Sequence, residues 1–240
     1  MLEVMYSTYI EYKRIYKNQF YCKLMLKACI FDFDGVIVNS EPAHRLSFRH
    51  TLKNFNIKIP LKQWKKEFTG TGARHIMHAI FQKYKIKEDI DEWVEKRSKD
   101  YEQHLIDHGL IIVPGFRRFY NELKKHKIKK CIGSGGHRHN IIKSLKSAKL
   151  DIRMPILSIE SVKHRKPHPE VYLKAAKLLK IKPNECVVFE DSPAGIIAAK
   201  KAGMKVIALT TTLPKDRLPK ANLFVKDFKS ISLKRIEKLF

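Results

Sequence analysis

The chain has 240 residues, of which 44% are hydrophobic and 30% are charged. A chain of this length can bury a hydrophobic core, and its composition is too apolar for an intrinsically disordered protein. No apolar run approaches the roughly 20 residues that a membrane-spanning helix needs, and the N-terminus lacks the apolar stretch of a signal peptide. We therefore expect a globular protein in the cytoplasm that makes no contact with a membrane.

The net charge is +25, which suggests nucleic-acid binding as one hypothesis. Residues 25–40 and 113–240 hold 31 Lys and Arg against 12 Asp and Glu, whereas residues 41–112 hold 14 against 10. Most of the excess consists of single lysines along predicted helices, without aromatic residues between them. This pattern is typical of a solvated surface, which we favour over a nucleic-acid partner, and a basic surface also attracts phosphorylated small molecules.

The first half of the chain predicts one strand followed by helices. Residues 26–32 form a short apolar run that predicts a buried strand. A helix over 42–58 follows, with Ser40 as its N-cap. Residues 61–108 predict further helices, interrupted by glycines, and contain no convincing strand. The pair Pro114–Gly115 ends this helical section.

From residue 116 onward, predicted helices alternate with predicted strands. Helices of ten or more residues between strands indicate right-handed crossovers and a parallel sheet that is covered on both faces. The predicted fold class is therefore α/β, with a three-layer Rossmann-like core. The helices span 116–126, 138–149, 169–180 and 193–202, and the strands span 128–132, 155–158, 186–189 and 206–209.

These patterns predict a core interrupted by an insertion. Residues 25–38 and 113–240 form the α/β catalytic core, and residues 39–112 form a helical cap inserted after the first strand. Ligands of open parallel sheets bind at the carboxyl ends of the strands, so the inserted helices would cover the site as a lid. For residues 1–24, two hypotheses compete: a start codon placed too early, with translation beginning at Met25, or a tyrosine-rich interaction helix.

Four polar clusters follow predicted strands, at the sheet edge where a ligand would bind. Each has an ordinary structural explanation, because Asp, Ser and Glu are common in turns and helix caps and the lysine is one of many. Four clusters at one edge favour a catalytic site. The clusters are Asp32-Phe33-Asp34-Gly35, Gly133-Ser134-Gly135-Gly136, Lys166-Pro167 and Glu190-Asp191-Ser192-Pro193.

These motifs resemble those of the haloacid dehalogenase-like (HAD) superfamily, in the helical-cap branch that includes β-phosphoglucomutase and phosphoglycolate phosphatase-like proteins. The resemblance runs from about Met25 to the C-terminus and rests on four segments. They read DFDGVIVNSEPAH (32–44), CIGSGG (131–136), KPHPEVYLKAA (166–176) and VVFEDSPAGIIAAKKAGM (187–204).

The resemblance implies a role for each catalytic residue. Asp32 would be the nucleophile that becomes an aspartyl phosphate, and Asp34 would be the general acid and then the general base. Ser134 would bind the phosphoryl oxygens, and Lys166 would neutralise charge between the phosphate and the nucleophile. Such covalent catalysis splits the hydrolysis into two easier steps.

The resemblance also implies a Mg²⁺ site formed by Asp32, the backbone carbonyl of Asp34, Glu190 and Asp191. The chemistry of the reaction calls for cations independently, because a carboxylate that attacks a phosphate dianion meets like-charge repulsion. Mg²⁺ prefers octahedral oxygen ligands, which two or three carboxylates and a phosphate oxygen supply. We therefore predict Mg²⁺ as the cofactor.

Four further residues are predicted to contact the substrate. The backbone N–H groups of Gly135 and Gly136 would approach phosphate oxygens closely, because glycine has no Cβ. His44 resembles a histidine of β-phosphoglucomutase-like relatives, although a packed or solvent-facing helix residue explains it equally well. Arg74, which follows the turn at residues 70–72, is the candidate from the cap.

The predicted function is a Mg²⁺-dependent phosphatase, a phosphoric monoester hydrolase acting on a small phosphorylated metabolite such as a sugar phosphate or phosphoglycolate. The alternative is a phosphosugar mutase of the β-phosphoglucomutase type. Gln103 aligns with a basic residue of the mutase cap, which favours hydrolysis. A receiver-like signalling module would also use an Asp, a hydroxyl and a Lys, but it would need neither Asp34 nor a helical lid. A nucleic-acid-binding protein would show salt-sensitive binding of generic DNA or RNA.

Overall fold

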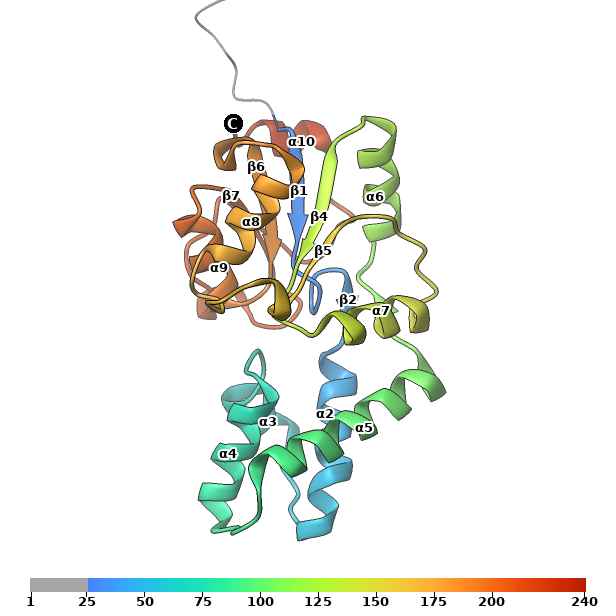
Figure 1. Cartoon of the computed structure of the whole chain (residues 1–240), viewed down its shortest axis with the longest axis vertical. Helices are drawn as coiled ribbons and strands as arrows, with labels where there is room; N and C mark the ends of the chain where they lie inside the picture. Colours follow the sequence, from blue (N-terminus) through green and yellow to red (C-terminus); the bar gives the residue numbers. More distant parts are fainter. Residues whose placement is uncertain (1–25) are drawn as a thin grey trace, which may run out of the picture.

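The computed structural model describes residues 26–240, and the extension predicted over 1–24 lies outside them. Six parallel strands form one sheet in the order β5-β4-β1-β6-β7-β8. Helices lie on both faces of this sheet, and further helices form a separate body beyond the carboxyl ends of its strands (Figure 1). The fold is therefore of the predicted α/β class, a three-layer parallel sheet with a helical cap.

The strands of the sheet are short, and the two central ones, β1 and β6, are buried at every position. Full burial follows from the helices on both faces, which leave a central strand no side toward solvent. The sequence did not predict the edge strand β8, which pairs only with β7. The strands are β1 (Ala28–Phe31), β4 (Lys129–Gly133), β5 (Ile156–Leu157), β6 (Cys186–Glu190), β7 (Lys205–Leu209) and β8 (Leu223–Val225).

Each face of the sheet has its own hydrophobic cluster. Helices α8 (Glu170–Leu179) and α9 (Pro193–Lys201) pack against one face. Helices α6 (Phe116–Lys125), α7 (Arg138–Ser147) and α10 (Leu233–Glu237) contribute to the cluster on the other. The predicted helices therefore occupy the two outer layers.

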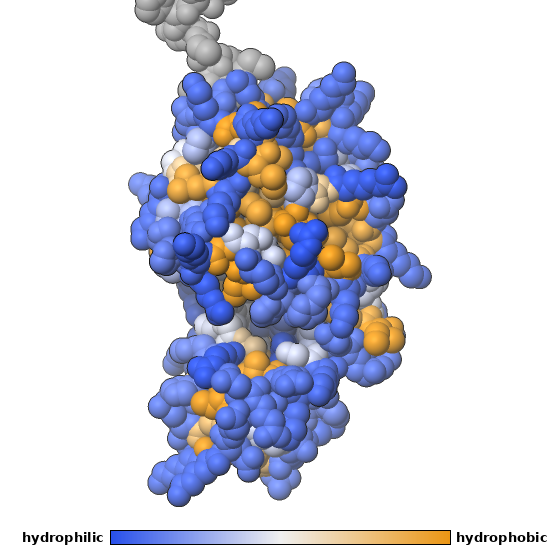
Figure 2. Space-filling view, in the orientation of Figure 1, coloured by the Kyte–Doolittle hydropathy of each residue, from blue (hydrophilic) through white to orange (hydrophobic). Residues whose placement is uncertain are grey.

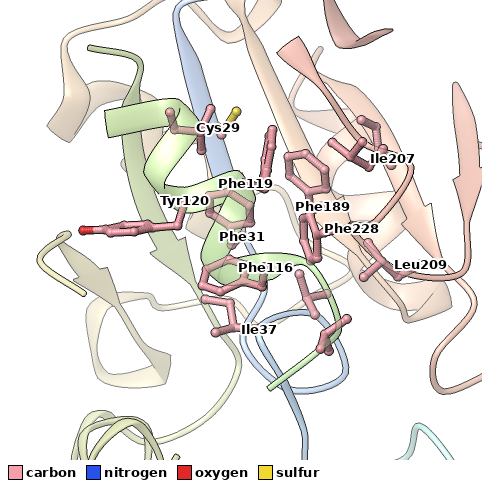
Figure 3. Close-up of a cluster of buried hydrophobic side chains, with 14 of the residues drawn as sticks. Cys29, Phe31, Ile37, Phe116, Phe119, Tyr120, Phe189, Ile207, Leu209 and Phe228 are labelled. Carbon is pink, nitrogen blue, oxygen red and sulfur yellow. The ribbon is translucent and has the colours of Figure 1, made fainter. Parts of the chain in front are cut away.

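Phenylalanines fill the second cluster (Figure 3). Phe31 of β1 and Phe189 of β6 are register neighbours, and their rings stack with centroids 4.9 Å apart. Phe116, Phe119 and Phe228 surround this pair, with centroid distances of 5.5, 6.3 and 6.1 Å from Phe31. Because Phe31 and Phe189 directly precede Asp32 and Glu190, this packing fixes the strand ends that carry the site.

The cap consists of α2 (Glu41–Thr51), α3 (Leu61–Glu67), α4 (Ala73–Tyr84) and α5 (Ile90–His108). It has its own hydrophobic cluster, which includes Phe48, Trp64 and Met77. The helix predicted over 42–58 is shorter than expected: α2 ends at Thr51, and a 3₁₀ turn over Leu52–Phe55 follows. Left-handed Asn56 then ends the helical path.

Two short antiparallel strands, β2 (Val38–Asn39) and β3 (Ile111–Ile112), connect the cap to the core. The sequence did not predict this two-stranded ribbon.

In the space-filling view, apolar residues gather on the visible face of the core, whereas the cap is mostly hydrophilic and the molecule is hollowed where the two meet (Figure 2). Across the described residues, no helix is both long and apolar enough to cross a membrane.

Candidate active site

Three neighbouring strands end at the same edge of the sheet and carry the predicted residues there. β1 pairs in parallel with β4 on one side and with β6 on the other. Asp32 follows β1, Ser134 follows β4, and Glu190 ends β6 with Asp191 next to it. All four residues are buried. The sheet therefore brings together residues that lie far apart in the sequence.

Lys166 enters this site from the loop between β5 and α8. Its Nζ lies 2.7 Å from Asp32 Oδ1 and 2.7 Å from Glu190 Oε1, and only 11% of its side chain is exposed. Burial alone would lower the pKa of Lys166, but the charges of Asp32 and Glu190 raise it well above its usual value. The lysine is therefore charged at neutral pH and bridges the two carboxylates.

Glu190 is held by hydrogen bonds on both of its oxygens. Tyr172 donates its hydroxyl to Oε1 at 2.7 Å, and the backbone N–H groups of Asp191 and Ser192 donate to Oε2 at 2.9 and 3.0 Å. Burial opposes ionisation of Glu190, but Lys166 and these hydrogen bonds lower its pKa below the usual value. Glu190 is therefore a fixed, ionised group that orients the lysine.

Three buried carboxyl groups, those of Asp32, Glu190 and Asp191, lie beside a single lysine. Burial raises the pKa of Asp32 to about 7, against the opposing charge of Lys166. Burial, with the nearby charges of Glu190 and Asp32, raises the pKa of Asp191 well above its usual value. The raised pKa values mean that Asp32 and Asp191 lack a compensating positive charge, which a bound cation would supply.

The donor set fits a hard divalent cation. Asp32, Glu190 and Asp191 each offer one carboxylate oxygen, and these three oxygens all lie within 4.8 Å of one another. Thr212 donates its hydroxyl to Asp191 Oδ2 and orients that carboxylate. Buried carboxylate oxygens without sulfur or imidazole ligands suit Mg²⁺ in preference to zinc or copper.

Gly35 makes room for this arrangement. Its φ is +70°, in the left-handed region, and a Cβ there would lie 1.8 Å from Asp191 Oδ2 and 2.5 Å from Thr212 Oγ1. The motif glycine therefore allows the turn after Asp34 and the close approach of Asp191 to the same loop.

Asp34 lies on the open side of the same site. Its side chain is 43% exposed, and it lines a pocket of about 320 Å³ together with Ser134, Gly135 and Gly136. Desolvation within the pocket raises the pKa of Asp34. A carboxyl group with a raised pKa, open to the pocket, suits proton transfer to and from a bound molecule.

The glycine turn after β4 positions Ser134. The backbone N–H of Gly136 donates to Ser134 Oγ at 3.0 Å, which fixes that hydroxyl oxygen. Nothing lies within 4 Å of the place where a Cβ on Gly135 would stand. Open space beside this turn is what a phosphoryl group needs in order to reach the hydroxyl and the backbone.

The cap supplies the opposite wall of the pocket. Apolar side chains from three cap helices and the segment after α3 line it beside polar Glu41, His44 and Arg97. This apolar wall over a charged floor is typical of small-molecule sites. The apolar residues are Phe48, Trp64, Phe68, Ala73 and Ile76.

His44 faces the catalytic acid from the cap. Its Nε2 lies 3.9 Å from Asp34 Oδ1, and its Nδ1 accepts a hydrogen bond from the guanidinium of Arg97. Burial and the charge of Arg97 hold the pKa of His44 well below its usual value. The imidazole is therefore neutral and carries its proton on Nε2, toward Asp34.

Arg97 of α5 is a pocket residue that the sequence reasoning missed. It is only 5% exposed, and its guanidinium lies over the rings of Phe48 and Tyr101 at 4.9 and 5.0 Å. Its buried Nε has no hydrogen-bond partner within residues 26–240. Burial lowers the pKa of Arg97 to about 10, which leaves it charged at neutral pH.

A signal for Arg97 was present in the sequence. The buried residues of α5 are Arg97, Tyr101 and Leu105, spaced four apart on one helical face. An arginine on the apolar face of a predicted helix needs a special environment. That pattern would have distinguished Arg97 from the many exposed basic residues.

Two cap residues singled out from the sequence lie elsewhere. Arg74 does not line the pocket; it is exposed and pairs with Asp91 at 2.7 and 3.0 Å. Its neighbours at 70–73 do line the pocket. Helix α4 begins at Ala73, and the side chain of Arg74 lies on the outer face of that helix. Gln103 is exposed and donates a hydrogen bond to Asp107, away from the pocket. The cation that α5 contributes to the pocket is Arg97.

A family comparison identifies the family to which this fold belongs. The sequence profile of haloacid dehalogenase-like hydrolases matches residues 29–209. The chain belongs to this family. It is accordingly an enzyme, a phosphoric monoester hydrolase of the haloacid dehalogenase-like type.

Individual proteins and structures are also similar to this chain. The chain is 27% identical over 183 residues to a phosphorylated carbohydrates phosphatase of Thermotoga maritima, covering 76% of this chain and 84% of that protein. It is 31% identical over 192 residues to SUPPRESSOR OF QUENCHING 1, chloroplastic, of Arabidopsis thaliana, covering 78% of this chain but only 18% of that protein. A β-phosphoglucomutase structure from Clostridium difficile superposes with a TM-score of 0.74 at 26% identity, over 90% of this chain and 97% of that one.

Proposed function

We propose that this enzyme is a Mg²⁺-dependent phosphatase that hydrolyses a small phosphorylated metabolite through an aspartyl phosphate on Asp32. The observation that carries the proposal is the bridge from Lys166 Nζ to Asp32 and Glu190, 2.7 Å from each, beside Asp191 and beneath the cap pocket. A carboxylate in contact with a cation, with a second acid nearby, is the arrangement that nucleophilic phosphoryl transfer requires.

In the first step, Asp32 attacks phosphorus and the bond from phosphorus to the leaving oxygen breaks. Lys166 offsets the repulsion between the carboxylate and the phosphate dianion, while Ser134 and the N–H groups of Gly135 and Gly136 bind the phosphoryl oxygens. These groups are fixed before the substrate arrives, so little reorganisation accompanies the reaction.

Asp34 transfers the protons. Its raised pKa favours the protonated form that donates a proton to the leaving oxygen, and neutral His44 lies beside it. After the leaving group departs, the ionised Asp34 accepts a proton from water as the water attacks phosphorus. Inorganic phosphate is released and Asp32 is restored.

Mg²⁺, when bound, would supply positive charge to the phosphoryl group and the nucleophile. Asp32, Asp191 and Glu190 would hold it through carboxylate oxygens. The family resemblance adds the backbone carbonyl of Asp34 as a further ligand.

The cap would select the leaving group and exclude water. Its apolar wall suits the carbon skeleton of a metabolite, and Glu41, His44 and Arg97 offer hydrogen bonds to hydroxyl or anionic groups. A sugar phosphate fits this mixture, and a phosphorylated carbohydrates phosphatase is among the relatives.

We keep a cytoplasmic location and the absence of a nucleic-acid partner as predictions. Cell fractionation tests the first, and a binding assay with generic RNA at low salt tests the second.

A phosphosugar mutase is the second candidate. The likeness to a β-phosphoglucomutase structure and the pocket cation Arg97 favour it, and Gln103 no longer argues against it. A mutase would pass the phosphoryl group from Asp32 to a sugar hydroxyl in place of water. Isomerisation of β-glucose 1-phosphate without release of free phosphate would establish the mutase and overturn the phosphatase.

Phosphate release from an aryl phosphate, with and without Mg²⁺, tests the proposed function. The wild type should turn over only with Mg²⁺, and Asp32→Asn should abolish turnover. Asp151→Asn, at an exposed position of the core, is the matched control and should leave turnover unchanged. Turnover that survives in Asp32→Asn would exclude Asp32 as the nucleophile.

A further inference from the structure

A second hollow lies at the junction of the cap and the core, beside the catalytic pocket. This groove has a volume of about 900 Å³ and runs between α3 of the cap and the segment after β7. It shares Glu41, Trp64 and Thr212 with the catalytic pocket. The indole Nε1 of Trp64 donates to Glu41 Oε1 at 2.7 Å, so these two side chains form a wall between the two hollows.

The charge of the groove is opposite to that of the catalytic pocket. Five cations line it, and none of them forms an ion pair with a carboxylate in residues 26–240. The acid among its lining residues is Glu41, whose Oε1 already accepts hydrogen bonds from Trp64 and Thr69. Unpaired cations that share one concave surface attract anions more strongly than lysines scattered over a convex face. The five cations are Arg45, Lys62, Lys65, Lys66 and Arg217.

The cations come from both domains. Arg45 lies on α2 and three lysines lie on α3, all in the cap, whereas Arg217 lies in the core after β7. Arg217 also donates hydrogen bonds to the backbone carbonyls of Lys65 and Lys66, at 2.8 and 3.2 Å, near the C-terminal end of α3. The core arginine therefore already holds the cap helix, and an anion in the groove would contact cap and core together.

Hydroxyl groups complete the groove. Thr210, Thr211 and Thr212 line its core side, and Thr69 lines its cap side. The hydroxyls of these threonines already donate within the protein, to the backbone carbonyls of Val225 and Gly35 and to the carboxylates of Asp191 and Glu41. The attraction for an anion therefore comes from the cations. The apolar residues Leu61, Leu213 and Pro214 lie among them, so the groove also offers an apolar surface.

We propose that this groove binds a compact polyanion with two or more linked phosphates, either inorganic polyphosphate or the phosphate chain of a nucleotide, and that the bound anion joins the cap to the core. The groove, at about 900 Å³, is much larger than one orthophosphate, and its cations come from α2, α3 and the segment after β7, which favours a chain of phosphates. The site is separate from the catalytic pocket because the Glu41–Trp64 wall divides them. Binding of a polyanion in this groove goes beyond the proposed phosphatase activity and does not depend on that activity.

Calorimetric titration of the full chain with tripolyphosphate, in EDTA so that nothing is hydrolysed, tests the proposal. We expect one site per chain. Lys62→Gln with Lys66→Gln, and separately Arg217→Gln, should each weaken binding at least about ten-fold. Lys124→Gln with Lys125→Gln removes two exposed charges from α6 and should weaken binding less than about three-fold. All variants should keep the circular dichroism spectrum and the unfolding midpoint of the wild type, which shows that they fold whether or not the enzyme is the proposed phosphatase.

Two further arms locate the ligand and identify its source. Lys166→Ala should bind tripolyphosphate as the wild type does, because Lys166 lies in the catalytic pocket. Equal affinity for tripolyphosphate and adenosine triphosphate would mean that the groove recognises the phosphate chain alone, whereas tighter nucleotide binding would add a contact with the apolar surface. Equal weakening by the groove and α6 variants, or loss of binding in Lys166→Ala alone, would overturn the proposal.

Discussion

The core side and the cap side of the catalytic pocket are built in different ways. On the core side, Lys166, Glu190 and Ser134 each have fixed partners, so their positions are set before a substrate binds. On the cap side, Arg97 is buried but leaves its Nε without a partner in the described chain. Under the proposed function, the fixed core side would perform one reaction on any phosphoryl group, whereas a substrate would complete the cap side.

The largest effect should come from disturbing the core side through Gly35. In Gly35→Ala, the new Cβ would stand 1.8 Å from Asp191 Oδ2, so the carboxylate must move. We expect turnover to fall about 100-fold or more, with weaker Mg²⁺ binding. Steady-state kinetics over a range of Mg²⁺ concentrations measures both.

Gly203→Ala is the matched control for Gly35. Gly203 has a similar φ of +75°, but nothing lies within 4 Å of its absent Cβ. This variant should lose about 1 kcal/mol of unfolding free energy through backbone strain and keep its turnover. If the two variants lose activity equally, the clash with Asp191 is not the cause.

The cap side should respond in a substrate-dependent way. Arg97→Met keeps much of the apolar volume and removes the buried charge. We expect kcat/KM for a metabolite substrate to fall about 10- to 100-fold, with little change for a small aryl phosphate. Arg74→Met, at the exposed arginine paired with Asp91, should change neither. An equal loss for both substrates in Arg97→Met would place Arg97 in the chemistry instead of in substrate selection.

The smallest effect should come from Tyr172→Phe, which removes one of several hydrogen bonds to Glu190. The backbone N–H groups of Asp191 and Ser192 remain, and Lys166 still contacts the carboxylate. We expect a loss of about 1 kcal/mol in unfolding free energy and a few-fold loss in turnover. Denaturant unfolding measures the first quantity and steady-state kinetics the second. A loss of turnover as large as that of Gly35→Ala would show that the other hydrogen bonds to Glu190 do not hold it in place without Tyr172.

The same contrast explains what the sequence could predict. The core residues follow strands, and parallel strands must end at one edge, so the positions of Asp32, Ser134 and Glu190 followed from element order alone. The structure places all of them with Lys166 as expected, and the fold class is the predicted one. The two-residue strands β2 and β3 and the edge strand β8 are too short to carry a pattern.

Cap residues are harder to predict because their place depends on helix rotation. Arg74 and Arg97 are both arginines on cap helices, but one faces solvent and the other faces the pocket. A change of one residue in helical phase turns a side chain by about 100°. The four-residue spacing of Arg97, Tyr101 and Leu105 indicates the buried face of α5, but the packing of α2 and α4 against α5 decides what that face contacts. Arg97 was therefore missed and Arg74 was chosen in its place.

The central claim is that Asp32 forms a covalent bond to phosphorus. Quenching the enzyme during turnover with Mg²⁺ and an aryl phosphate, then reducing with borohydride, converts an aspartyl phosphate to homoserine, which peptide mass spectrometry locates. The account predicts homoserine at position 32, dependent on substrate, with Asp34 and Asp191 unmodified. Turnover with no modification at Asp32, or with homoserine at another aspartate, would contradict it.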